Sequence, residues 1–168
     1  YHDKSAVIEV KSLHKSFGSN EVLKGISCTI PEGLITVVIG GSGSGKSVLI
    51  KHMIGLLEPT KGSVIIFGDT LSDLDSRARQ KLQQRIGVLF QSAALFDSMT
   101  IEQNIAFPLV EGERISHTKA MPEVMKVAQA LKVDDLLPNL PDAISNGQRK
   151  RVALARALVS KPDIVIYD

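Results

Sequence analysis

The residues that most clearly indicate a chemical function form a short glycine-rich run early in the chain. The run reads Gly40, Gly41, Ser42, Gly43, Ser44, Gly45, Lys46 and Ser47, with Val48 next. This order matches the pattern G-x-x-x-x-G-K-[ST], in which glycines let the backbone wrap closely around phosphate oxygens. The amides at the end of the run would meet the same phosphates at a helix N-terminus, where the helix dipole favours anions. The sequence therefore predicts a site for a nucleoside triphosphate.

Two side chains of the run have separate tasks in such a site. The Lys46 ammonium is expected on the β- and γ-phosphates, and the Ser47 hydroxyl is expected to bind Mg²⁺. Val48 would complete the set of residues around the phosphates. The alternative is a flexible Gly-Ser loop without a ligand, but a buried strand over 34–39 and a helix over 47–57 are expected on its two sides, as the pattern requires.

The remaining elements must position this loop. Alternating apolar and polar residues predict strands, and short β-branched runs predict buried strands; these segments are 7–13, 21–30, 63–67, 86–90 and 163–167. The part from 93 to 140 is helical and rich in loops. In it, one apolar helix face carries Val124, Val127, Ala128 and Leu131, and Pro122 is expected in the first turn of that helix. A last helix covers 145–159, with Ser145 as its N-cap.

A second motif lies at the start of this last helix. It reads Ile144-Ser145-Asn146-Gly147-Gln148, followed by Arg149-Lys150-Arg151-Val152-Ala153-Leu154-Ala155-Arg156-Ala157-Leu158. This segment resembles the signature helix of ABC ATPases, which usually reads L-S-G-G-Q. By that resemblance, Ser145, Gly147 and Gln148 contact the γ-phosphate of an ATP held by a second copy of the protein. The alternative is an ordinary amphipathic helix with a serine cap.

Asn146 departs from the family, which has a glycine at this position. Asparagine tolerates a positive φ better than most residues, so the backbone of the motif is expected to survive. Its side chain adds bulk next to the phosphate of the second copy, and this puts the strength of that contact in question.

Three further residues resemble functional positions of the same family. Asp168 ends an apolar run and resembles the Walker B aspartate, which holds Mg²⁺ through water; Gln91 resembles the Q-loop glutamine, which touches the metal site and senses the membrane partner. Phe17 resembles the aromatic residue that stacks on adenine, and its alternative role is that of a core phenylalanine. The resemblance thus makes Lys46, Gln91 and Asp168 catalytic, and makes Ser47, Gln91 and Asp168 the metal site.

A finer likeness follows Gln91. The segments Leu89-Phe90-Gln91-Ser92-Ala93-Ala94-Leu95-Phe96-Asp97-Ser98-Met99-Thr100 and Glu102-Gln103-Asn104-Ile105-Ala106-Phe107-Pro108-Leu109 resemble the ATPase subunit of Mla-type transporters. Those transporters move phospholipid between membranes together with an MCE-domain protein. The likeness implies a lipid as the transported substrate.

Composition excludes several other classes. The 168 residues are 43% hydrophobic and 23% charged, with a net charge of +2, which gives no reason to expect nucleic-acid binding. The single cysteine, Cys28, cannot form an internal disulfide and is expected to be a small buried residue. The four histidines have no metal-ligand spacing, and no apolar run approaches the ~20 residues that cross a bilayer.

The resemblance implies an α/β fold: a P-loop NTPase core sheet, an antiparallel β layer and an inserted helical subdomain. The single domain would place its catalytic core in 1–91 and 161–168 and its helical subdomain in about 92–160. Two copies would close on two Mg-ATP and drive transport through a membrane permease, at the cytoplasmic face of the inner membrane. In the family, a glutamate follows the aspartate at position 168 and a later strand enters the core sheet, so the sequence is expected to be a fragment that hydrolyses almost no ATP by itself.

Three other functions remain open from the sequence. They are a soluble ABC ATPase in DNA repair or translation, a P-loop kinase for a small molecule, and a nucleotide-binding module without hydrolysis. The chain has neither a long coiled-coil insert nor a second tandem domain, which argues against the first. The helix after Ser145 argues against the second.

Overall fold

The computed structural model describes residues 5–90 and 93–168. The chain forms two compact units, residues 1–83 and residues 84–168, and each has its own packed interior. None of the helices in the described part of the chain is both long and apolar enough to cross a membrane.

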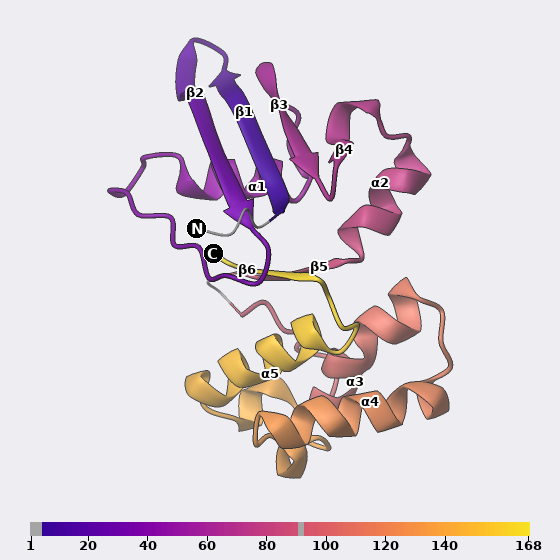
Figure 1. The fold of residues 1–168 in the computed structure, drawn as a ribbon. Coiled ribbons are helices and arrows are strands. Elements are labelled where there is room, and N and C mark those ends of the chain that lie inside the picture. The colour runs from indigo at the N-terminus through magenta and orange to yellow at the C-terminus, as the bar shows by residue number, and fades with distance from the viewer. Residues whose placement is uncertain (1–4, 91–92) are drawn as a thin grey trace. The chain divides into compact units, whose positions relative to one another are not determined.

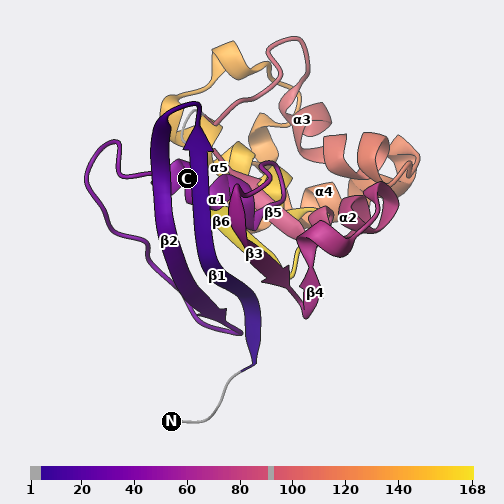
Figure 2. The same ribbon diagram turned by 90° about the horizontal axis from the view of Figure 1, so that it is seen from above.

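The first unit is built around an antiparallel sheet. Its strands are β1 (Ala6–Phe17), β2 (Asn20–Pro31), β3 (Lys61–Ile66) and β4 (Asp69–Thr70), in the order β2-β1-β3-β4. Strands β2, β1 and β3 lie side by side in both views (Figure 1 and Figure 2). Apolar residues at every second position of β1 bury one face of the sheet, since Ile8 pairs with Ile66 and Val10 with Val64. The antiparallel β layer expected from the sequence is confirmed.

Two helices accompany this sheet. Helix α1 (Lys46–Met53) follows the glycine-rich loop, and α2 (Ser76–Gln83) follows a 3₁₀ turn, η1 (Leu71–Asp73). Helix α1 is shorter than the expected 47–57, because Gly55 takes a left-handed conformation with φ of +73° just after its C-cap. Helix α2 carries only one buried residue, Leu82, so the apolar periodicity that would have predicted it is absent.

The buried strand expected over 34–39 is wrong for this structure. These residues form no regular strand, and Ile35 and Ile39 are 95% and 90% exposed. A β-branched run becomes a strand only when a neighbour supplies the hydrogen-bond ladder. No strand of the described residues pairs with it.

The second unit contains a short parallel sheet and a helical cluster. Strands β5 (Ile86–Leu89) and β6 (Ile164–Tyr167) pair in parallel. The α-helices are α3 (Ile101–Phe107), α4 (His117–Ala130) and α5 (Asn146–Leu158). They are joined by a short π-helix, η2 (Pro108–Gly112), and by the 3₁₀ turns η3 (Asp134–Leu136) and η4 (Pro141–Ala143). Their common core includes Ile101, Ile105, Val124, Val152 and Val159.

Helix α4 confirms the expected apolar face but not the expected start. Val124 and Ala128 are fully buried in the helical core, with Val127 and Leu131 packed against it. Pro122 lies inside the helix instead of in its first turn. The turn before Pro122 packs on the same core through Ala120, which is buried, although a proline cannot donate a backbone hydrogen bond within the helix.

Candidate functional site

The glycine-rich loop surrounds its own lysine. Helix α1 begins at Lys46, directly after the loop. The Lys46 ammonium donates to the carbonyl oxygens of Gly40 at 2.6 Å and Gly41 at 2.7 Å. A positive charge therefore lies within the curve of the loop, at the N-terminal end of a helix, and both features favour an anion there.

Gly45 holds this loop against the sheet. It is the N-cap of α1 with φ of +90°. A Cβ atom at Gly45 would lie 2.9 Å from Leu23 Cδ2 and 3.1 Å from Val22 Cγ1, both on β2. Only glycine fits this close approach with this φ. Val22 and Leu23 are neighbours of the loop that the sequence did not reveal, since they look like ordinary strand residues.

Phe17 lies at the end of β1, and its side chain is not a core residue. It is 48% exposed, and the Lys15 ammonium lies 5.2 Å from the centre of its ring. Lys15 pairs across the ladder with Leu23, the residue that borders Gly45. The exposed ring and the glycine-rich loop therefore share β2 as a neighbour within one unit.

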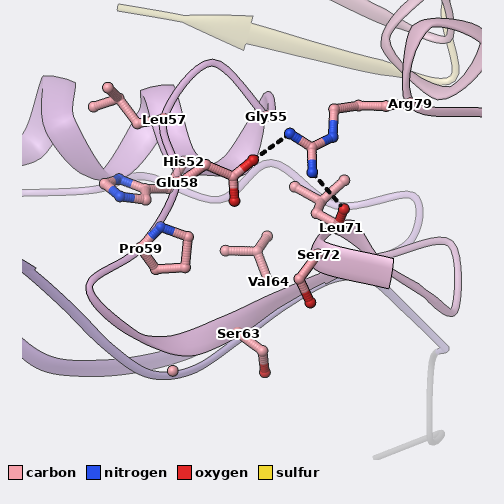
Figure 3. Close-up of a pocket in the computed structure, with 11 residues that line it drawn as sticks. His52, Gly55, Leu57, Glu58, Pro59, Ser63, Val64, Leu71, Ser72 and Arg79 are labelled. Atoms are coloured by element: carbon pink, nitrogen blue, oxygen red, sulfur yellow. Dashed lines mark hydrogen bonds and ion pairs between the residues drawn. The ribbon is translucent and has the colours of Figure 1, made fainter. Parts of the chain in front are cut away.

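A small cavity lies beside α1 (Figure 3). None of the residues that line it belongs to the glycine-rich loop. Its volume of about 20 Å³ admits one water molecule, which is far too little for a nucleotide. His52 lines it and is fully buried, with Nδ1 2.7 Å from the Val48 carbonyl oxygen. Because a carbonyl only accepts, Nδ1 is the donor of this bond, and Nε2 has no hydrogen-bond partner among the residues that the structure describes. This cavity is a structural feature of the helix and not the candidate site.

In the second unit, the start of α5 forms a complete capping box. The Ser145 hydroxyl accepts from the Gln148 amide at 3.2 Å, and the Gln148 side-chain oxygen accepts from the Ser145 amide at 2.8 Å. The predicted N-cap is confirmed. Asn146 is the first residue of the helix and is not among the residues with positive φ. The backbone at position 146 therefore does not require a residue that tolerates a positive φ.

The other residues predicted for the site lie in different parts of the structure. Asp168 follows β6, is exposed, and donates its backbone amide to the Leu89 carbonyl at 2.8 Å. Gln91 lies outside the described residues. Ser47 is exposed in the first turn of α1. Within residues 5–90 and 93–168, no three His, Cys, Asp or Glu side chains gather as a metal cluster. The Ser47 hydroxyl and the phosphates of a substrate are oxygen ligands of the kind that Mg²⁺ takes.

Cys28 is less buried than the sequence led us to expect. It is half-buried on β2, and burial raises the pKa of its thiol. A raised pKa lowers the fraction of thiolate, which is the nucleophilic form. Cys28 is therefore not a candidate nucleophile.

Asn104 is a residue that the motifs did not single out for any role. It is fully buried in α3, where its side-chain amide donates to the carbonyls of Phe96, Met99 and Thr100 and its oxygen accepts from the Phe96 amide at 2.8 Å. These bonds fix the conformation of the segment shortly after Gln91. The signal in the sequence is that Asn104 falls, at helical spacing, on the same face as the apolar residues Ile101 and Ile105.

Comparison with known proteins agrees with this geometry. The sequence profile described as "ABC transporter" matches residues 23–168. The chain is 41% identical, over 96% of its length, to "Probable ribonucleotide transport ATP-binding protein mkl" of Mycobacterium leprae, and 40% identical, over 99% of its length, to "Protein TRIGALACTOSYLDIACYLGLYCEROL 3, chloroplastic" of Arabidopsis thaliana. It covers 46% and 50% of these proteins, so the chain spans about half the length of the relatives it matches.

A solved structure extends the comparison to the fold. It is a dimeric post-hydrolysis state of the ATP-binding cassette MJ0796, bound to ADP and Pi, with a TM-score of 0.81 and 32% identity. The match covers 96% of this chain and 73% of that one. The α/β architecture expected from the sequence is thereby confirmed.

Proposed function

Because this chain belongs to the ABC transporter family of ATP-binding domains, we propose that it binds Mg-ATP on the loop of residues 40–48 and, in the complete protein, hydrolyses it to drive transport. One observation carries the proposal: the Lys46 ammonium lies between the carbonyls of Gly40 and Gly41 at the start of α1. ATP binding would exchange at least one of these carbonyls for a phosphate oxygen.

The adenine end of the site is proposed at Phe17. Its ring is exposed, and β2 joins it to the glycine-rich loop through Leu23 and Gly45. Stacking uses the π-face that every base has, so it holds a base without selecting it strongly.

The metal is proposed at Ser47, with Gln91 and Asp168 as further ligands through the family resemblance. Mg²⁺ keeps several waters and takes a few protein oxygens plus substrate phosphates, which suits a serine hydroxyl beside a phosphate loop. When bound, Mg²⁺ neutralises the charge that develops on the phosphates during transfer to water. Lys46 stabilises the same charge from the protein side.

A second copy of the chain is the proposed partner of each site. Ser145, Gly147 and Gln148 would then reach the γ-phosphate held by the other copy, as the exposed start of α5 allows. The dimeric state reported for MJ0796 supports this assembly.

The same proposal includes a membrane permease as partner and a peripheral position at the cytoplasmic face of the inner membrane. It also includes the division of the chain into a catalytic core (1–91 and 161–168) and a helical subdomain (92–160).

A lipid is the proposed substrate, with an MCE-domain protein as a further partner. The likeness after Gln91 supports it, and one relative is named after a glycolipid. Another relative is named for ribonucleotide transport, so the names of relatives do not agree on one substrate. Lipid analysis of the native complex, isolated from membranes, would distinguish the two.

The test of nucleotide binding is a Lys46→Ala variant, titrated with Mg-ATP by calorimetry. Loss of a charge-assisted contact to phosphate removes roughly 1.5–3 kcal/mol, so affinity should fall about ten- to more than a hundredfold. Lys51→Ala is the matched control, because Lys51 is an exposed lysine of the same helix. Unchanged affinity in Lys46→Ala, or an equal loss in Lys51→Ala, would refute the assignment of the loop.

A further inference from the structure

We infer that Lys15 is a positioning residue for the nucleotide base. It covers one face of the Phe17 ring, so that a base stacks on the other face. The inference rests on the function proposed above. Its geometric basis is the distance of 5.2 Å between the Lys15 ammonium and the ring centre, which lies within the range of a cation–π contact. Phe17 is still 48% exposed, so a large part of its ring stays accessible.

A hydrogen bond to the backbone also holds the end of the Lys15 side chain. Its ammonium donates to the carbonyl oxygen of Glu58 at 2.6 Å. The Glu58 carboxylate in turn pairs with Arg79 of α2, and Arg79 also donates to the Leu71 carbonyl at 2.8 Å (Figure 3). The position of the ammonium over Phe17 therefore depends on a turn that is tied to a separate helix.

The same turn holds the end of β1 through its backbone. The Thr60 amide donates to the His14 carbonyl at 2.9 Å, and the Ser16 amide donates to the Thr60 hydroxyl at 3.1 Å. The turn leads away from α1, the helix that starts at Lys46. The connection between α1 and β3 thus also holds the end of the strand that carries the Phe17 ring.

This arrangement orders the ring before a base arrives. A phenylalanine at the end of a strand would otherwise lose rotamer freedom when a base stacks on it, and that loss would weaken binding. With the ammonium on one face and the strand end held by the turn, most of the ordering is already complete in the folded protein. The contribution of Lys15 should therefore appear with ligands that carry a base and be absent with phosphate alone.

The experiment compares ATP with tripolyphosphate, titrated by calorimetry into the full chain and its variants. Lys15→Met keeps the length of the side chain but removes the cation. The cost of ordering the Phe17 ring would then fall on ATP binding, which should weaken roughly three- to tenfold, while tripolyphosphate affinity stays unchanged. Lys15→Arg keeps a cation over the ring and should restore most of the loss. The matched control is Lys11→Met, since Lys11 lies on the same strand, is 59% exposed and pairs with Glu9 at 3.1 Å; it should change neither affinity.

Each other outcome has a definite meaning. An equal loss for ATP and tripolyphosphate would overturn the inference, because Lys15 would then act on the phosphates. Unchanged ATP affinity in Lys15→Met would overturn it too, and a loss of ATP affinity in Phe17→Leu would then leave the proposed base site standing. If Phe17→Leu also binds ATP normally, the proposed stacking itself is wrong. The ratio of the two affinities within one variant stays informative even where the substitution lowers the melting temperature.

Discussion

Two glycines of the predicted motifs, Gly45 and Gly147, lie in different surroundings. Gly45 has φ of +90° and lies where a Cβ would meet Leu23 at 2.9 Å, so the fold of the chain itself requires it. Gly147 lies inside α5, and a Cβ there would meet only the Ser145 hydroxyl, at 4.0 Å. Nothing in the packing around Gly147 explains its missing side chain. A ligand that approaches from outside, such as a phosphate held by a second copy, would explain it.

This difference predicts opposite effects of the same substitution. Gly45→Ala should lower the free energy of unfolding by about 1–3 kcal/mol, because alanine is strained at that φ and collides with β2. Gly147→Ala should leave it unchanged or raise it by up to about 1 kcal/mol, because alanine favours a helix. Urea denaturation measures both. Gly147→Ala should nevertheless weaken ATP-dependent association in light scattering; a variant that associates normally would show that no ligand needs the space at Gly147.

At the scale of elements, two helices begin in the same way. Thr100 and Gln103 form a capping box at α3 with bonds of 3.2 and 2.9 Å, and Ser145 and Gln148 form one at α5 with bonds of 3.2 and 2.8 Å. The two boxes should stabilise their helices about equally. Only the box at α5 belongs to the motif that is proposed to reach a phosphate, so α3 is an internal control for α5.

The prediction is that Thr100→Ala and Ser145→Ala have similar effects on stability and different effects on function. Each should lower the free energy of unfolding by roughly 0.5–2 kcal/mol, the usual cost of losing such a cap. ATP-dependent association, followed by light scattering, should fall in Ser145→Ala alone. Equal losses of association in both variants would mean that Ser145 acts only as a helix cap.

At the scale of the whole molecule, the sequence predicted those elements whose pattern is set by neighbouring residues. The alternation in β1 and β2 and the serine cap of α5 are examples, because side-chain period and capping are set by residues close together in the chain. Contacts between distant residues could not be predicted in this way. The bond from Lys15 to Glu58 joins positions 43 apart, and the apposition of Gly45 and Leu23 depends on how β2 packs against the loop. The sequence did not predict helix α2, because a helix made mostly of polar residues shows no apolar periodicity.

The exposed segment 34–39 is expected to decide whether the molecule self-associates in solution. Ile35 is 95% exposed, Val37 72% and Ile39 90%. The six residues Leu34-Ile35-Thr36-Val37-Val38-Ile39 contain no charge and no proline. Exposed segments of this kind, rich in β-branched residues, pair readily with another chain.

Purified residues 1–168 should therefore self-associate with increasing concentration. Light scattering measures this association. Ile35→Lys should reduce the association, because a charge at a 95% exposed position repels a second copy and removes apolar surface that a contact would bury. Ile8→Lys is the contrasting variant: Ile8 is 2% exposed, so a charge there should unfold the sheet of the first unit and increase association. Two results would contradict this prediction: a wild-type chain that is monomeric and melts cooperatively, or equal association in wild type and Ile35→Lys. Either would show that the exposed segment does not cause self-association.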